Sequence, residues 1–114
     1  MTWFETNDVH VLRTEEDLRE GPACDRLERL LDEATRGGRR VLLAFGPGTR
    51  LSAHALGLVA HACAEAARRG GALVVSACDP SQRWLLDVTG LAGVLQLHAT
   101  EREALASLVP SAAA

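Results

Sequence analysis

Two short segments near the start of the chain, residues 2–5 and 9–13, alternate apolar and polar side chains. This alternation predicts two half-buried β-strands. Asn7-Asp8 between them suits a tight turn, so the two strands can pair as an antiparallel hairpin. The charged residues 15–20 that follow predict a loop.

Two long segments have the periodicity of helices. Over residues 22–36, apolar side chains recur every three or four positions, Pro22 suits the first helical position, and two glycines follow. A second helix is predicted over residues 53–69, with Ser52 as its N-cap. Most of its surface is apolar and one polar stripe remains, so we expect it to be largely buried with one edge in solvent.

Two shorter helices are predicted over residues 80–89 and 101–108, because a capping-box pattern precedes each of them. In this pattern, side chains at the start of a helix satisfy backbone N–H groups that have no partner within the helix. At the start of the first helix the pattern consists of Asp79, Pro80 and Gln82, and at the start of the second it consists of Thr100 and Glu103.

Continuous apolar runs of strand length occur at residues 40–45 and 72–77, and such runs are typical of strands covered on both faces. Residues 93–97 predict a last strand. The resulting order β-β-α-β-α-β-α-β-α predicts an α/β fold with a mixed, mostly parallel central sheet of four or five strands and about four helices. We expect strands 40–45 and 72–77 to be adjacent and parallel, and helices 22–36 and 53–69 to pack on one side of the sheet.

The chain of 114 residues has the size of one domain. We expect a single domain over residues 1–109, followed by a short flexible tail over residues 110–114. No apolar run approaches the ~20 residues that a membrane span needs, and the N-terminus lacks the layout of a signal peptide. These features predict a cytoplasmic protein without membrane insertion. The formal net charge of −3 disfavours nucleic-acid binding.

Residue usage excludes some chemistry. The chain has 12 arginines and no lysine. Neither a catalytic lysine nor the lysine of a phosphate-binding P-loop is therefore available. Cys24, Cys63 and Cys78 include no Cys-x-x-Cys pair, which fits a reducing compartment rather than a disulfide framework or a zinc ribbon. His54 and His61 lie two helical turns apart, about 10 Å, which is too far to share one zinc ion. We therefore expect no metal and no cofactor.

Five segments of the sequence together resemble the STAS domain, the fold of bacterial anti-sigma factor antagonists. The resemblance covers roughly residues 39–108 and extends more weakly to the N-terminal strands and helix. It implies a STAS-like fold and a role in protein interaction rather than catalysis. The segments are Val41-Leu42-Leu43, Leu56-Gly57-Leu58, the Arg69-Gly70-Gly71 stretch through Val75, Leu85-Leu86-Asp87-Val88-Thr89-Gly90-Leu91, which is the most specific, and Glu103-Ala104-Leu105.

The resemblance also implies a phosphorylation switch, from which this chain departs. The family motif at the start of the second helix reads Asp-Ser-Ser-Gly-Leu-Gly, and its second Ser accepts phosphate from a kinase that doubles as the anti-sigma factor. Aligned on Leu56-Gly57, His54 stands at the acceptor position, Ser52 at the Asp, and Ala44 at an Asp that commonly ends the preceding strand. His54 has no hydroxyl, so Ser/Thr-type phosphorylation cannot occur there.

Partner binding is expected at the loop before the second helix and at that helix's first turns. His54 is a solvent-facing residue, a neutral partner contact, a pH sensor or a phosphohistidine. Ser52 is an N-cap alone or also a substitute phosphoacceptor. Trp84 is an exposed interaction hot spot or a side chain folded onto a neighbouring helix. The residues expected to bind the partner are Thr49, Arg50, Ser52, His54, Leu58 and Trp84.

The expected partner is an anti-sigma factor with serine/threonine-type kinase activity or another STAS protein, and a homodimer is a further alternative. Two other hypotheses remain: a STAS-like subunit of a lipid-transport ATPase complex and a small-ligand-binding STAS domain. An enzyme would need convergent polar groups in a pocket. Arg50, Ser52 and His54 form the only such cluster in the sequence and have no carboxylate beside them, so we expect no enzymatic activity.

Overall fold

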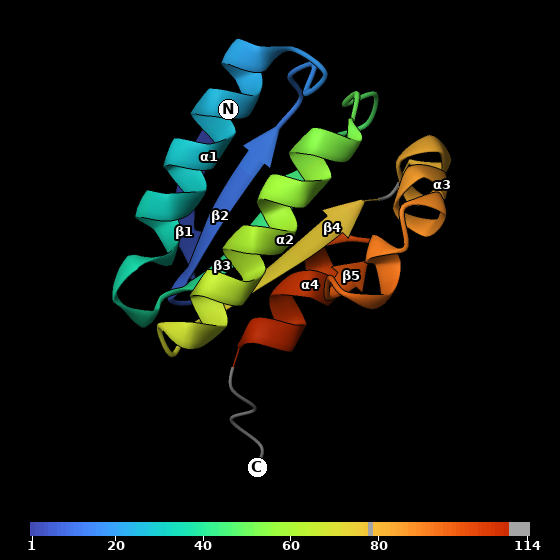
Figure 1. The fold of residues 1–114 in the computed structure, drawn as a ribbon. Coiled ribbons are helices and arrows are strands. Elements are labelled where there is room, and N and C mark those ends of the chain that lie inside the picture. Colours follow the sequence, from blue (N-terminus) through green and yellow to red (C-terminus); the bar gives the residue numbers. More distant parts are fainter. Residues whose placement is uncertain (78, 110–114) are drawn as a thin grey trace.

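The computed structural model describes residues 1–77 and 79–109 (Figure 1). Cys78 and the tail predicted at residues 110–114 lie outside the described residues. The chain forms one five-stranded sheet in the order β1-β2-β3-β4-β5. The strands are β1 (Thr2–Thr6), β2 (Val9–Thr14), β3 (Arg40–Phe45), β4 (Ala72–Ala77) and β5 (Leu97–His98), and the helices are α1 (Gly21–Thr35), α2 (Ala53–Arg68), α3 (Pro80–Val88) and α4 (Glu101–Leu108), with 3-10 turns at Arg36–Gly38 and Leu91–Gly93.

The first two strands form the predicted antiparallel hairpin, with Phe4 opposite Val11. Asn7 and Asp8 both have positive φ, at 50° and 63°. This backbone is that of a two-residue turn whose twist matches the twist of the flanking strands. All other strand pairs are parallel. The sheet is therefore mixed, and the predicted adjacent parallel pairing of β3 and β4 is confirmed.

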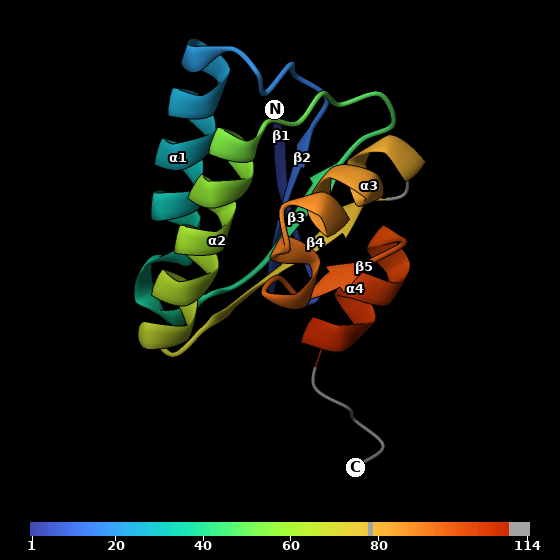
Figure 2. The same cartoon turned by 45° about the vertical axis from the view of Figure 1, so that its right-hand side comes forward.

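Helices α1 and α2 lie side by side over one face of the sheet (Figure 2), which confirms the predicted arrangement. Both helices bury an apolar stripe against alternate residues of β3 and β4, because successive side chains of a strand point to opposite faces. Helix α3 completes this layer through the buried Leu86. The core on this face includes Leu27, Leu31, Val41, Leu43, Leu56, Val59 and Val75.

The opposite face of the sheet is covered by the short helix α4. Ala104 and Leu108 of α4 pack against the remaining apolar side chains of the strands. Since both faces of β3 and β4 are covered, these strands have the continuous apolar sequences that the pattern of residues 40–45 and 72–77 indicated. The strand residues in this smaller core are Val9, Val11, Leu42 and Val74.

The last strand differs from the prediction, which placed it at residues 93–97. Gly90 adopts a left-handed conformation with φ of 75°, and the chain then forms a 3-10 turn. In this turn the N–H groups of Val94 and Leu95 both donate to the carbonyl of Leu91. Leu95 is buried in the larger core, so the segment packs as a turn before it reaches the sheet edge. The pairing with β4 therefore begins only at Leu97.

Candidate functional site

The loop between β3 and α2, residues 46–52, lies at the carboxyl ends of the parallel strands. We call it the interaction loop. This edge is where open α/β sheets usually bind their ligands. Pro47, Gly48 and Arg50 of the loop are exposed, as are Ala53 and His54 in the first turn of α2. The loop and the helix start thus present exposed residues on both sides of the buried Thr49.

Hydrogen bonds fix one side of the interaction loop to the segment that follows β2. The N–H of Gly46 and the hydroxyl of Thr49 both donate to the carbonyl of Thr14, each at 2.9 Å. In return, the N–H of Leu18 donates to the carbonyl of Arg50 at 2.8 Å. The loop therefore has a defined backbone position although it has no regular secondary structure.

Ser52 acts as the predicted N-cap of α2, because its Oγ accepts a hydrogen bond from the N–H of Ala55 at 3.1 Å. The same hydroxyl donates to the carbonyl of Leu18 at 2.9 Å. The thiol of Cys24 also donates to that carbonyl, at 3.1 Å, and burial is the main cause that raises the pKa of this thiol. A phosphate on Ser52 would remove the hydroxyl proton that holds Leu18.

Helix α3 fixes the other side of the interaction loop. Asp79 is the N-cap of α3 and accepts from the N–H of Ser81 at 2.9 Å through Oδ1 and from the N–H of Gly48 at 3.2 Å through Oδ2. Hydrogen bonds from Ser81 and then from Gly48 lower the pKa of Asp79. Gln82 donates its Nε2 to the carbonyls of Gly46 at 2.9 Å and Thr49 at 3.1 Å.

The prediction that Gln82 completes a capping box was therefore wrong. Its side chain turns inward to the loop carbonyls instead of back to the backbone at Asp79. Gln82 lies three and four positions before Leu85 and Leu86, on the inward face of α3. A polar residue in that apolar stripe was the signal that could have identified it, since a buried polar group needs a partner.

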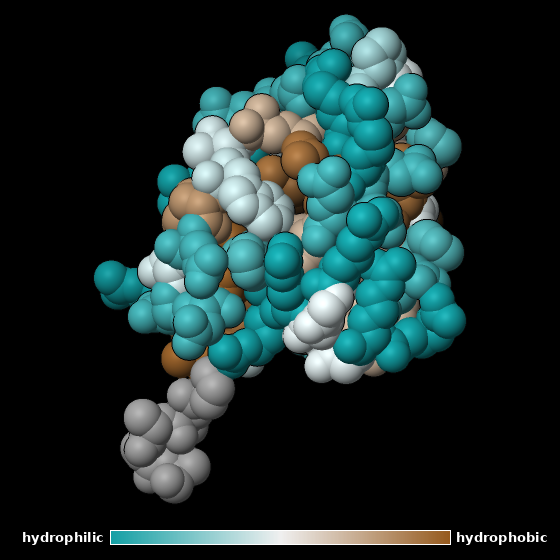
Figure 3. Space-filling view, turned by 90° about the vertical axis from the view of Figure 1, so that its left-hand side faces the viewer, coloured by the Kyte–Doolittle hydropathy of each residue, from teal (hydrophilic) through white to brown (hydrophobic). Residues whose placement is uncertain are grey.

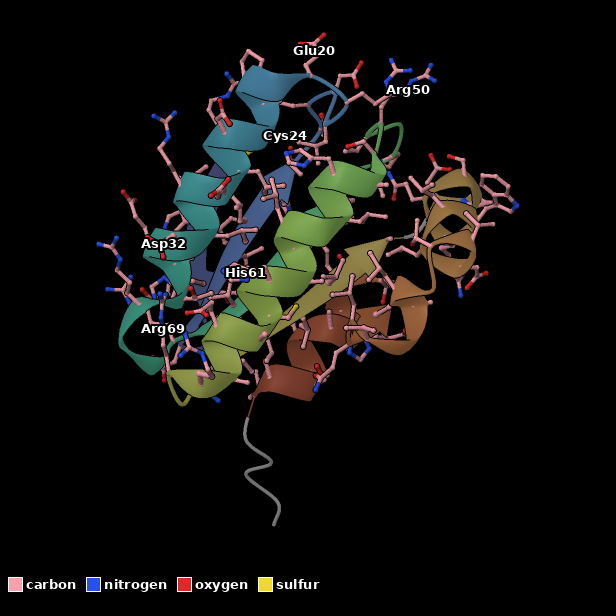
Figure 4. All side chains as sticks on the ribbon, viewed as in Figure 1. Glu20, Cys24, Asp32, Arg50, His61 and Arg69 are labelled. Atoms are coloured by element: carbon pink, nitrogen blue, oxygen red, sulfur yellow. The ribbon has the colours of Figure 1, made fainter. Side chains whose placement is uncertain are left out.

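A cleft of about 500 Å³ separates the interaction loop from α3, with Arg50, Leu51, Gln82 and Trp84 among its lining residues. Trp84 stands at its rim with 65% of its surface exposed, so it is not folded onto a neighbouring helix. Figure 4 shows the Arg50 side chain extending away from the body of the molecule, on the same side as Glu20. In the segment between β2 and α1, hydrogen bonds from Arg19 lower the pKa of Asp17 to about 2.

Four of the six residues expected to bind a partner lie at the interaction loop or the cleft, and two of these four, Arg50 and Trp84, line the cleft together. Arg50, Ser52 and His54 lie in or directly after the interaction loop, and Trp84 lies across the cleft. Thr49 is only 3% exposed, so its side chain supports the loop from inside. Leu58 is half-buried one turn further along α2, in the hollow between α1 and α2.

A polar network joins the ends of α1 and α2 on the side of the molecule remote from the interaction loop. Arg69 donates from Nη1 to the hydroxyl of Thr35 at 3.0 Å and from Nη2 to Asp32 at 3.3 Å. Asp32 also pairs with Arg36 at 2.7 Å, and Glu65 pairs with Arg68. Figure 3 views the molecule from the left-hand side of Figure 1, where α1 lies, and this face is mainly hydrophilic with a smaller group of hydrophobic side chains. The network fixes the helix ends and adds little stability, because exposed ion pairs are weak.

Over residues 1–77 and 79–109, no group of three His, Cys, Asp or Glu side chains is placed to hold a metal ion. Within the same residues, no helix is both long and apolar enough to cross a membrane.

The fold and the site define a class: a small α/β domain with an exposed, hydrogen-bonded loop at the carboxyl edge of its sheet. The model of the STAS domain family matches residues 5–104, so the chain belongs to the STAS domain family. This confirms the family predicted from the sequence. No curated protein sequence matches the chain.

Two solved structures are similar to this one. The protein TM1081, determined by NMR, has a TM-score of 0.73 at 14% identity, with 96% of this chain and 88% of that chain covered. The Bacillus cell fate determinant SpoIIAA, determined in the phosphorylated form, has a TM-score of 0.62 at 21% identity, with 93% of this chain and 96% of that chain covered. At these identities the similarity demonstrates a shared fold.

Proposed function

We propose that this chain is a non-enzymatic interaction module of the anti-sigma factor antagonist type. It binds a partner protein through the interaction loop, the first turn of α2 and Trp84. The observation that supports this most is that hydrogen bonds fix the backbone of the loop on the β2 side and on the α3 side. The side chains of Arg50, His54 and Trp84 around it remain exposed. A surface that is already ordered loses less conformational entropy on binding. A binding role is therefore favoured for this edge.

The partner we propose is an anti-sigma factor with kinase activity or another STAS protein. The family supports this choice, and so does the similar fold of SpoIIAA, a cell fate determinant that exists in a phosphorylated form. The polar cluster noted in the sequence, Arg50, Ser52 and His54, does not act as a catalytic set in this proposal. Ser52 is hydrogen-bonded to Leu18 and Ala55, and Arg50 and His54 project from separate turns of the chain.

Ser/Thr-type phosphorylation at His54 does not control this module in our proposal, because the residue has no hydroxyl. Ser52 is the first candidate if phosphate is found at this edge. Its modification would remove the donor to Leu18 at 2.9 Å and place about −1.5 to −2 charges at the start of α2. Such a phosphate would act by loosening the contact with the segment before α1 as well as by its charge.

Affinity purification from native lysate tests the proposal, with the chain as bait and mass spectrometry as the readout. We expect one main partner to bind the wild-type chain and to be depleted at least fivefold with Trp84→Ala, since a hot-spot side chain contributes more than about 1 kcal/mol. Arg50→Ala should deplete the same partner. Arg102→Ala is the matched control, because Arg102 is an exposed arginine on α4, which covers the opposite face of the sheet. A partner lost equally with all three variants would contradict the proposal.

A further inference from the structure

Gln82 makes the most specific contact between α3 and the interaction loop. Only 2% of this residue is exposed, and its Nε2 bonds two carbonyls, of Gly46 and Thr49, on either side of the exposed Gly48. One carboxamide group therefore closes the loop around the exposed residues Pro47 and Gly48. Asp79 adds a third bond from the same helix, to the N–H of Gly48.

The other end of the Gln82 carboxamide has no partner among residues 1–77 and 79–109. Its Oε1 is buried and accepts no hydrogen bond from the residues that the structure describes. A buried acceptor without a donor is unfavourable for folding, whereas an apolar side chain of similar size would fill the same space without that penalty. That apolar side chain would leave the carbonyls of Gly46 and Thr49 without the Nε2 donor, so what the amide adds at this position is its contact with the loop. Its two donated bonds act specifically on the loop.

The loop also has an attachment that does not depend on Gln82. Gly46 and Thr49 both donate to the carbonyl of Thr14, on the β2 side. Loss of the Gln82 contact would thus loosen the loop on the α3 side only, where the bond from the N–H of Gly48 to Asp79 would remain. Trp84 lies two residues after Gln82 and borders the same cleft. A change at Gln82 therefore alters how the loop is placed relative to Trp84.

We propose that Gln82 is a positioning residue that fixes the interaction loop to α3, so that Arg50 and Trp84 form one preformed recognition surface. This inference rests on the proposed function, because it assigns the surface to partner binding. Gln82 itself does not touch the partner, since it is buried beneath the loop.

Gln82→Glu tests the inference, because the substitution keeps the size of the side chain and replaces its amide donor. At pH 7.5 an ionised carboxylate would face two carbonyl oxygens and repel them. Burial raises the pKa of such a carboxyl group, and when protonated it can donate one hydrogen bond to a loop carbonyl. We therefore expect the loop to be released at pH 7.5 and partly restored at pH 5.5. Gln82→Leu cannot donate at either pH.

Amide hydrogen exchange at Gly48 and Thr49, followed by NMR, reports the state of the loop without a partner. At pH 7.5 we expect protection factors about tenfold lower than wild type in both Gln82 variants, as for the loss of a hydrogen bond of typical strength. At pH 5.5 only Gln82→Glu should recover. Arg83→Glu is the matched control, since it adds a carboxylate at the next, exposed position and should show no such recovery. Unchanged protection in folded Gln82→Leu would overturn the inference.

Affinity for the purified partner is then measured with the same variants at both pH values. Binding should weaken with loop protection and recover for Gln82→Glu at pH 5.5, relative to wild type at that pH. If loop protection falls but affinity does not, the positioning role in recognition is wrong. The proposed function would still be decided separately by the Arg50→Ala and Trp84→Ala variants.

Discussion

Gly71→Ala is expected to destabilise the domain by about 3 kcal/mol, because a side chain at this position has no room. A Cβ on Gly71 would lie 2.2 Å from the carbonyl oxygen of Arg39 and 2.8 Å from the carbonyl carbon of Gly38. Both atoms belong to the backbone that leads into β3, so no side-chain rotation can relieve the clash. The turns that follow α1 and α2 are in contact at this point. To admit the added methyl group, the start of the β3–β4 pair would have to move.

Urea denaturation measures this effect, and Gly57→Ala is the matched control. Gly57 lies in α2, is exposed, and a Cβ there meets nothing within 4 Å. Alanine at an exposed helical position should raise the free energy of unfolding by about 0.5–1 kcal/mol. The two substitutions add the same methyl group with opposite expected signs. A Gly71→Ala protein as stable as wild type would show that the two turns do not pack as described.

His54→Glu is expected to weaken partner binding roughly 30-fold to 150-fold, corresponding to about 2–3 kcal/mol. The residue occupies the first turn of α2 and is exposed. A carboxylate there imitates the charge of a phosphate at the position where the family motif has its acceptor. Covering an unpaired charge with a partner surface costs its desolvation energy. Binding should therefore fall although the domain remains folded.

The fold itself should tolerate this change. Negative charge at a helix N-terminus is favoured by about 0.3–1 kcal/mol, and α2 has no acidic residue in its first turn. Circular dichroism melts should therefore show equal or slightly higher stability for His54→Glu. Isothermal titration calorimetry against the purified partner gives the affinity. His54→Ala, which only shortens the side chain, should reduce binding much less. Equal affinity of wild type and His54→Glu would place the interface elsewhere.

Local features of the structure were predictable from the sequence because their causes are local. Ser52, Asp79 and Thr100 are N-caps as predicted, since each accepts a hydrogen bond from an N–H within three residues. The turn at Asn7-Asp8 depends on two residue types that tolerate positive φ. The order of helices and strands follows from periodicity in the same way.

The roles of single side chains that contact distant segments were not predictable. Gln82 bonds to carbonyls 33 and 36 positions away, and no local pattern distinguishes this from a capping role. Thr49 was expected to bind a partner, but its hydroxyl donates a hydrogen bond to the carbonyl of Thr14, 35 positions earlier. The late start of β5 has a similar origin, because burial of Leu95 in the core outweighs the strand-like sequence of residues 93–97.

The central claim is that the interaction loop, the first turn of α2 and Trp84 together form the surface that binds the partner. Its most direct test is a ¹H–¹⁵N NMR titration of the labelled chain with the purified partner. We predict that the largest shift changes and line broadening occur at the amides of residues 48–57 and at the indole N–H of Trp84. Changes centred on β1 or α4, with the signals of the interaction loop unmoved, would contradict the claim.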